Sequence, residues 1–372
     1  MKKLLCLLLC LVMILPTVVL AEDEEFEEEI LDEEEWLDEE EWLDEEEDIE
    51  IPDEFEDIFD ELENEIDNTV DRENLQQNPN LPDDTINILL IGVDTRYKEM
   101  GKEQERGDVQ IIASIDPVAG TIKLSSIMRD LYVPIYGRKN SRRINTAYAD
   151  GGEVAIQTIN TNFEMNVEHY IAINFYGVVS IVESLGGIDV ELTKAEAKAI
   201  NSYLKKNKSK ISKTYDDKKG DRQKLEEKAG VQHLDGLQAL MYARLRHSDK
   251  NDNDFNRTSR QRKLLELLLT KVLTNDDTDY VGLLTNCMQY VKTNMTAMDI
   301  FNIMQTILGS DLIDRAKSGE TLLEDFRIPM DETWKYDTKD GSSVVVFRTK
   351  DRKQQNVEGL HEFIYGQYYP AN

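Results

Sequence analysis

The chain has 372 residues, with 75 Asp or Glu side chains against 43 Lys or Arg side chains and a formal net charge of −32. The negative charge is concentrated in residues 22–72, which hold 31 acidic side chains and a single basic one, Arg72. Such a leader excludes a nucleic-acid-binding role, because that role needs clustered Lys and Arg to neutralise phosphates. The part after Arg72 is almost neutral and long enough for a domain with a sizeable core.

The N-terminus has the pattern of an export signal. Lys2 and Lys3 precede an apolar run of 17 residues, 4–20, which ends at the small residue Ala21. The run is near the lower length limit for crossing a bilayer, so residues 1–21 are either a cleaved signal peptide or a retained signal anchor. In both cases we expect the protein to leave the cytoplasm, either secreted or anchored to the outer face of the plasma membrane.

Residues 22–83 are predicted to be an acidic, disordered spacer. From Glu27 to Glu50 they repeat the hexads EEEILD, EEEWLD, EEEWLD and EEEDIE. A period of six fits no helical stripe, and the like charges repel one another. The alternative is that the repeat binds cations or basic wall proteins, with Trp36 and Trp42 as contact points.

Three apolar runs after residue 84 predict the first strands of a folded domain. Residues 86–93 form a nearly continuous apolar run of strand length, which is typical of a strand covered on both faces. Residues 109–116 and 121–128 are two further strand-like runs. They are joined by the turn sequence DPVAG and therefore predict a hairpin.

Helices and strands alternate in the next part of the chain. We expect a helix at about 152–162, a strand at 167–174, a helix at 175–185 closed by two glycines, and a strand at 188–192. This alternation predicts an α/β sandwich. The stretch at about 201–228 is rich in lysine and poor in large apolar side chains, which indicates an exposed insertion.

Two carboxylates stand at neighbouring strand ends. Asp94 directly follows the strand 86–93, and Asp108 opens the next strand. Such a pair is able to share a hard cation such as Mg²⁺ (or Mn²⁺), which takes oxygen ligands and keeps waters and substrate phosphates in its shell. The alternative is that Asp94 is a turn residue and Asp108 a cap.

Arginines gather near the ends of the same elements. Those outside the helices are Arg106, Arg129, Arg143, Arg244 and Arg246. We expect residues 242–246 to form a strand in which Tyr242 shares a face with Arg244 and Arg246. Arginine's planar fork suits bidentate contacts with phosphate, although an ordinary surface ion pair is the alternative for any single one of them.

A helix beginning at Asp254 is predicted to be cationic in its first turn and apolar afterwards. One face carries, at spacings i, i+3 and i+4, Arg257, Arg260 and Gln261. The same stripe continues as Leu264, Leu265 and Leu268. Such a face fits a phosphate head beside an apolar tail, and for the leucines the alternative is an ordinary core position.

Several common kinds of site are excluded by the sequence. There is no P-loop and no Gly-rich dinucleotide motif, so a nucleotide is not the implied phosphate donor, and neither GxSxG nor HExxH occurs. Cys6 and Cys10 lie in the N-terminal apolar run, which leaves Cys287 alone in the domain. We therefore expect no intrachain disulfide, Cys-based zinc site or CxxC pair there.

The order of these motifs resembles the LytR-CpsA-Psr (LCP) family of bacterial envelope proteins. The resemblance rests, in chain order, on IGVDTR, RGD, SIMRD, RRINTAY, LGGIDV, LDGLQALMYARLR and DFNRTSRQR. It covers about residues 84–275, the motif core of a domain expected over residues 84–370, and residues 321–366 are compatible with its closing strands and helix. The resemblance implies a three-layer α-β-α sandwich with a central mixed sheet.

The resemblance also implies an extracytoplasmic phosphotransferase. Such enzymes move a glycopolymer, for example a teichoic acid or a capsule chain, from a polyprenyl-diphosphate carrier at the membrane surface to peptidoglycan. Carried over by motif, Asp94 and Asp108 hold Mg²⁺ and take part in catalysis with Arg129. The residues implied to surround the diphosphate are Arg106, Arg129, Arg143, Arg244, Arg246, Arg257, Arg260 and Gln261.

The chain departs from the family pattern at two positions, and two rival functions stay open. Arg143 stands where the family usually has Lys, and Met128 stands where it usually has Pro. A polyprenyl-diphosphate hydrolase would use the same site, whereas a non-catalytic envelope regulator or polymer-binding protein would not need these charged residues. The sequence leaves open which of the two carboxylates takes the acceptor's proton.

Overall fold

The structure is a computed structural model. It describes residues 66–93, 95, 100, 105–206, 223–245, 254–274, 286–287, 289–309, 312–318, 320, 323–339 and 341–371. The export signal and the acidic hexads therefore lie outside the described residues. Within the described part of the chain, no helix combines the length and the apolar character that a membrane span requires.

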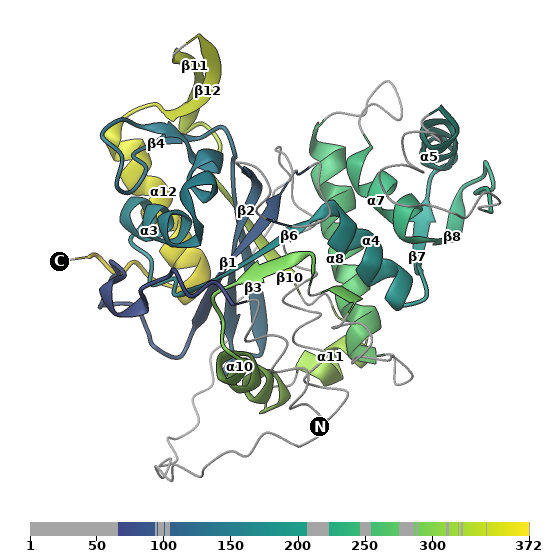
Figure 1. The fold of residues 1–372 in the computed structure, drawn as a ribbon, viewed down its shortest axis with the longest axis horizontal. Coiled ribbons are helices and arrows are strands. Elements are labelled where there is room, and N and C mark those ends of the chain that lie inside the picture. Colours follow the sequence, from purple (N-terminus) through teal and green to yellow (C-terminus); the bar gives the residue numbers. More distant parts are fainter. Residues whose placement is uncertain are drawn as a thin grey trace, which may run out of the picture.

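Among the described residues, a six-stranded mixed sheet forms the centre of the domain, in the order β10-β3-β2-β1-β6-β9 (Figure 1). Its strands are β1 (Ile86–Val93), β2 (Gly107–Asp116), β3 (Thr121–Ile127), β6 (His169–Asn174), β9 (Val291–Thr293) and β10 (Leu323–Ile328). The pairs β1–β6 and β3–β10 are parallel, and the other pairs are antiparallel. The predicted first strand and the hairpin that follows it are confirmed.

Helices cover both faces of this sheet, which confirms the expected three-layer sandwich (Figure 1). They are α3 (Gly152–Phe163) and α12 (Lys350–Tyr365) on one side, and α4 (Phe175–Ser184), α7 (Gly236–Arg244) and α8 (Asp254–Thr274) on the other. Successive side chains of β1 point to opposite faces. Ile88 and Leu90 belong to the core shared with α4, α7 and α8, and Leu89 and Ile91 belong to the core shared with α3 and α12.

Smaller elements complete the domain. They are β4 (Tyr132–Val133), β5 (Arg142–Arg143), β7 (Ile188–Leu192), β8 (Gly230–Leu234), β11 (Trp334–Lys339), β12 (Ser342–Phe347), α5 (Lys194–Lys206), α10 (Ala297–Gly309), α11 (Leu312–Ser318), and the 3₁₀ helices η3 (Arg72–Asn74), η4 (Ile144–Thr146) and η5 (Tyr148–Asp150). The lysine-rich stretch begins in α5, and its residues 207–222 lie outside the described residues. Cys287 is a free thiol, and burial raises its pKa to about 12.

The strand expected at residues 242–246 is wrong, because residues 242–244 belong to helix α7, which ends at Arg244 with Leu245 as its C-cap. Asp235 caps this helix: its side chain accepts from the Gln238 N–H at 2.9 Å, and the Gln238 side chain accepts from the Asp235 N–H at 3.0 Å. Residues two apart in a helix point in divergent directions. Tyr242 is accordingly 5% exposed in the core, whereas Arg244 is exposed.

The spacer boundary expected at residue 83 is also wrong, because the chain joins the domain from residue 66 onward. We call residues 66–81 the N-terminal strap. Ile66 forms a parallel bridge to Thr293 of β9, and the Tyr170 hydroxyl donates to Asp67 Oδ2 at 2.6 Å. Leu81 is buried. The strap thus extends the sheet edge and belongs to the folded domain.

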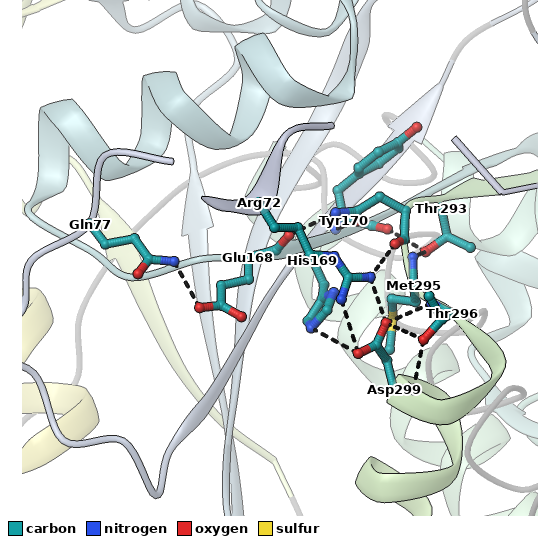
Figure 2. A network of polar contacts seen from close by, with 10 residues as sticks. Arg72, Gln77, Glu168, His169, Tyr170, Thr293, Met295, Thr296 and Asp299 are labelled. Atoms are coloured by element: carbon teal, nitrogen blue, oxygen red, sulfur yellow. Dashed lines mark hydrogen bonds and ion pairs between the residues drawn. The ribbon is translucent and has the colours of Figure 1, made fainter. Parts of the chain in front are cut away.

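Arg72 fastens the strap to the start of α10 (Figure 2). Its Nη1 donates to Asp299 Oδ1 at 3.1 Å and its Nη2 to Asp299 Oδ2 at 2.5 Å. Asp299 Oδ2 also accepts from the Thr296 N–H at 2.6 Å. Further along the strap, Gln77 Nε2 donates to Glu168 Oε1 at 2.8 Å. These contacts hold the strap against residues far away in the sequence.

The strap should make the domain sensitive to acid. Burial acts to raise the pKa of Asp299, but hydrogen bonds from Arg72 and Thr296 outweigh it and leave this pKa below its ordinary value. The pKa of Asp67 is lowered in the same way, against burial, by Thr69 and Tyr170. A carboxyl whose pKa is lower in the folded state stabilises the fold above its unfolded pKa, and this contribution is lost as the pH falls below about 4.

We therefore expect the free energy of unfolding, measured in urea, to fall between pH 5 and pH 3. The Asp299→Asn variant should be less stable at pH 5 and should lose less stability on acidification than the wild-type protein. An equal loss in both proteins would contradict the assignment of this effect to Asp299.

Candidate functional site

The candidate site lies along the edge of the sheet at which β1 and β6 end. The register pairs Val93 of β1 with Gly107 of β2 on one side and with Asn174 of β6 on the other. Neighbouring strands lie about 4.8 Å apart, so these three residues share one short stretch of the edge. Ligands of α/β sheets commonly bind beyond the carboxyl ends of parallel strands.

Asp108 occupies a β-bulge at this edge. The register of β1 and β2 shifts by one residue beside Val93, which leaves Asp108 without a pairing partner on β1. The Asp108 N–H donates instead to the Arg106 carbonyl at 3.0 Å. The two strands approach closely here: a Cβ atom added to Gly107 would lie only 2.8 Å from Ile91 Cγ2. Bulges re-aim side chains next to functional sites, and this one turns Asp108 out of the regular ladder.

Two side chains of the described residues hold the Asp108 carboxylate. Asn145 Nδ2 donates to its Oδ1 at 2.8 Å, and Arg129 Nη1 donates to its Oδ2 at 3.3 Å. The Asp108 side chain is still 22% exposed. Ion-paired hydrogen bonds between a guanidinium and a carboxylate are usually about 2.7–2.9 Å long, so the Arg129 contact is the looser of the two. The structure thus brings together two of the three predicted catalytic residues.

Asn145 was not singled out in the sequence, although it lies in the motif RRINTAY. It belongs to η4 and is 4% exposed. Its backbone N–H donates to the Arg129 carbonyl at 3.3 Å, and Gln110 Nε2 donates to the Ile144 carbonyl at 3.1 Å. Asn145 Oδ1 is buried and has no hydrogen-bond donor among the described residues. The only sequence signal was an amide side chain within a run of charged motifs.

A second group of charges continues the edge beyond Arg129. Asp130 Oδ1 lies 3.1 Å from Arg143 Nε, and Asp130 Oδ2 lies 3.5 Å from Arg129 Nε. Arg143 Nη2 also donates to the Ser343 carbonyl of β12 at 2.5 Å. Arg106, next to the bulge, is exposed. Three of the predicted diphosphate-binding arginines therefore lie on this side of the edge.

Arg244 lies beside the β6 end of the same edge. It is the last residue of α7, and its Cζ lies 4.3 Å from the centre of the Phe175 ring, a cation–π contact. Phe175 is the first residue of α4, which Asn174 caps by accepting from the Gly177 N–H at 3.1 Å. Phe175 follows Asn174, which pairs with Val93 at the end of β1. Arg244 therefore lies near the strand ends at which the site was predicted, but it belongs to a helix and not to a strand.

Arg260 is placed elsewhere, which corrects the expectation that it contacts a diphosphate. It is 6% exposed, and its Nε donates to Glu196 Oε1 at 2.6 Å. Its Nη1 donates to the Leu245 carbonyl at 3.2 Å. These contacts assign Arg260 to a buried ion pair that joins α8 to α5.

The apolar stripe of α8 is part of the core. Its leucines, at most 1% exposed, are Leu264, Leu265 and Leu268. They belong to the cluster that contains Val178 of α4 and Leu240 of α7. The structure therefore shows the ordinary-core alternative for these three residues.

The remaining predicted site residues cannot be placed. Asp94 and Arg246 lie outside the described residues, as do the side chains of Arg257 and Gln261 in α8. In the part of the chain that the structure describes, no three or more His, Cys, Asp or Glu side chains form a group that could hold a metal ion. The metal pair of Asp94 and Asp108 therefore stays a prediction.

Comparisons with known proteins agree with the motif order and the fold. The profile of the LytR_cpsA_psr family matches residues 58–353. The chain is 32% identical over 222 residues to a polyisoprenyl-teichoic acid–peptidoglycan teichoic acid transferase TagU from Bacillus cereus, and 33% identical over 221 residues to the TagU of Enterococcus faecalis. Both matches cover 59% of this chain and 64% of the relative, which is less than two thirds of the relatives' length.

A solved structure shares the fold. It is described as the LytR-CPS2A-psr family protein YwtF (TagT) with bound octaprenyl pyrophosphate lipid, and it superposes with a TM-score of 0.51 at 20% sequence identity. The superposition covers 78% of this chain and 96% of that one. At this identity, the likeness extends to the fold alone.

Proposed function

Because the chain belongs to the LytR_cpsA_psr family, we propose that it is a phosphotransferase that moves a glycopolymer from a polyprenyl-diphosphate carrier onto peptidoglycan. The curated relatives are named as teichoic acid transferases, and the structural neighbour carries octaprenyl pyrophosphate. These names support a polyprenyl-linked, phosphate-containing polymer as the class of substrate. Such a carrier resides in a membrane, so the proposal places the protein in the cell envelope, extracytoplasmic and at the membrane surface.

The observation that carries the proposal is the contact of Arg129 with Asp108 at the bulge. Asp108 belongs to β2 and Arg129 lies in the turn after β3, and the domain around them is almost neutral. Phosphoryl transfer depends mainly on positioning and on charge stabilisation, so cationic forks beside a partly exposed carboxylate are the groups that it needs. An ordinary surface ion pair would not require a bulge to present its carboxylate.

A divalent cation, Mg²⁺ or Mn²⁺, fits the donors at this edge. Hard cations take oxygen ligands, and Asp108 offers a partly exposed carboxylate whose Oδ2 has only the long contact with Arg129 among the described residues. Asp94 follows Val93 in the sequence, and Val93 pairs with Gly107. We therefore propose that Asp94 and Asp108 hold the cation, which when bound would neutralise charge on the diphosphate.

The arginines would bind the diphosphate itself. The proposed set is Arg106, Arg129, Arg143 and Arg244, with Arg246, Arg257 and Gln261 from the part of the sequence near the start of α8. Arg129 is the central member. Its hydrogen bond to Asp108 is long and therefore weak, so its guanidinium can release this carboxylate and bind a phosphate oxygen. Arg143 keeps the charge of the usual lysine but presents it as a planar fork, one arm of which here donates to the Ser343 carbonyl of β12.

In the proposed reaction, a sugar hydroxyl of peptidoglycan attacks the phosphorus that carries the glycopolymer. A bond forms between this phosphorus and the acceptor oxygen, the bond to the bridging oxygen breaks, and polyprenyl phosphate leaves. The proton of the hydroxyl passes to a carboxylate, either Asp94 or Asp108. The arginines stabilise the charge that builds up on the transferred and the leaving phosphate.

The polyprenyl chain would lie on the side of the sheet that carries α4, α7 and α8. Phe175 is partly buried and packs against the core of that side, whereas Arg244 above its ring is exposed. A diphosphate bound by Arg244 would therefore have apolar protein directly beside its lipid end. This arrangement supports a lipid-linked substrate over a free, soluble diphosphate.

The test is to incubate the purified full-length chain with a polyprenyl-diphosphate-linked oligosaccharide, peptidoglycan fragments and Mg²⁺, and to analyse the products by mass spectrometry. We expect a phosphodiester-linked adduct together with polyprenyl phosphate, and neither product after EDTA treatment. Polyprenyl phosphate without an adduct would identify a hydrolase. Bound but unchanged substrate would identify a non-catalytic regulator or polymer-binding protein.

A further inference from the structure

Asp108 alone cannot keep a fixed orientation, because it stands at a bulge where the ladder with β1 is interrupted. Its side chain is 22% exposed, and of its two side-chain contacts with described residues, the one with Arg129 is long, at 3.3 Å. The hydrogen bond from Asn145 Nδ2 to Asp108 Oδ1 is 2.8 Å long, which is 0.5 Å shorter than the Arg129 contact. Asn145 is therefore the side chain that fixes the direction of this carboxylate.

Asn145 is itself rigidly held. It is 4% exposed, and its backbone N–H donates to the carbonyl of Arg129, the other residue that contacts Asp108. The residue before it is tied at both ends: the Ile144 N–H donates to the Leu131 carbonyl at 2.8 Å, and the Ile144 carbonyl accepts from Gln110 Nε2 at 3.1 Å. Asn145 thus transmits the positions of β2 and of the chain after β3 to the Asp108 carboxylate.

The orientation of the Asn145 amide is fixed by charge. Only its Nδ2 can face a carboxylate as a donor, so Oδ1 must point the other way. That oxygen is buried without a donor among the described residues. An amide that turns its donor to Asp108 and leaves an acceptor unused is arranged for a function other than filling space in the core.

We propose that Asn145 is the positioning residue of the metal site: it holds Asp108 through Oδ1, so that Oδ2, whose contact with Arg129 is long, would serve as a ligand of a divalent cation while Arg129 would bind the phosphate. The inference rests on the proposed function, since it concerns the same carboxylate. Residues that orient a metal ligand by hydrogen bonding typically change metal affinity by about 10–100-fold when they are removed.

The test measures binding of Mn²⁺ by the full-length chain, by electron paramagnetic resonance of the free ion, in parallel with the transfer assay. Asn145→Ala should weaken Mn²⁺ binding by about 10–100-fold. In the Asp108→Asn background the same change should have no further effect, because Asn145 acts through Asp108. Asn145→Ser, whose hydroxyl is too short to reach Asp108, should behave like Asn145→Ala and serves if the alanine variant does not fold.

The matched control is Asn294→Ala. Asn294 is as buried as Asn145, with 3% exposure, and its amide donates to the Glu168 carbonyl and accepts from the Tyr170 N–H at the other end of β6. This variant should lose thermal stability but keep wild-type affinity for Mn²⁺. Wild-type affinity in a folded Asn145 variant, or an equal loss in Asn294→Ala, would overturn the inference alone. A wild-type chain with neither Mn²⁺ binding nor transfer would overturn the proposed function and the inference with it.

Discussion

Replacement of Arg129 by alanine is expected to lower the rate of glycopolymer transfer by about 10²–10³-fold, the usual effect of removing one donor that stabilises transition-state charge. Arg129 is the guanidinium that contacts the carboxylate at the bulge, and its side chain is 38% exposed, so it can turn toward a bound substrate. Arg129→Lys should recover only part of the rate, because an ammonium keeps the charge but not the planar fork. Initial rates of adduct formation, measured by mass spectrometry at saturating substrate, test both variants.

The matched control for this experiment is Arg315→Ala. Arg315 also pairs with a carboxylate, Glu320 at 3.0 Å, but it donates to the Gly120 carbonyl in the turn at the other end of the β2–β3 hairpin. Its removal should leave the transfer rate within about twofold of wild type, since surface ion pairs contribute little. Equal rates in the Arg129 and Arg315 variants would show that Arg129 has no role in the reaction.

A chain that begins at residue 73 is expected to be much less stable than one that begins at residue 66. The shorter chain lacks the contacts of Arg72 with Asp299 and of Asp67 with Tyr170. A hydrogen bond to a charged group contributes about 1.5–3 kcal/mol, and the 31% exposure of the Arg72 side chain favours the lower part of this range. The two losses together predict a destabilisation of about 3–4 kcal/mol, or a melting temperature roughly 10 °C lower.

Two further proteins separate the effect of the strap from the effect of chain length. Removal of residues 1–65 alone should leave the melting temperature close to that of the full chain. In the chain that begins at residue 73, Asp299→Asn should recover part of the stability, because it neutralises a carboxylate left without its arginine. Identical melting temperatures for the chains starting at residues 66 and 73 would show that the strap contributes nothing to stability.

The sequence predicted the elements whose pattern is local and long enough. The strand at Ile86–Val93, the β2–β3 hairpin and the helix at Phe175–Ser184 all appear close to their expected bounds. The strand predicted at residues 242–246 was wrong, because five residues are too few to distinguish the side-chain period of two in a strand from the period of 3.6 in a helix. The cap formed by Asp235 and Gln238 was the signal that decided in favour of a helix.

The prediction that the spacer ends at residue 83 was wrong for a different reason. The strap is acidic before Arg72, and its composition continues that of the leader. What orders it are single contacts with residues about 100 to 230 positions away, such as Tyr170 and Asp299. A compositional prediction averages over a stretch and cannot detect a few specific partners, so it placed the start of the domain too late.

The sequence by itself determined the class of fold, the order of the motifs and the residue types of the candidate site, because periodicity and motif spacing are properties of the chain alone. Only the tertiary structure decided which of those residues meet. In the structure, Arg129 contacts Asp108, and Arg260 forms a buried ion pair with Glu196. Asn145 is the side chain that orients the Asp108 carboxylate. The physical reason is that strand register and a one-residue bulge fix the directions of side chains, and both are set by pairing between segments distant in sequence.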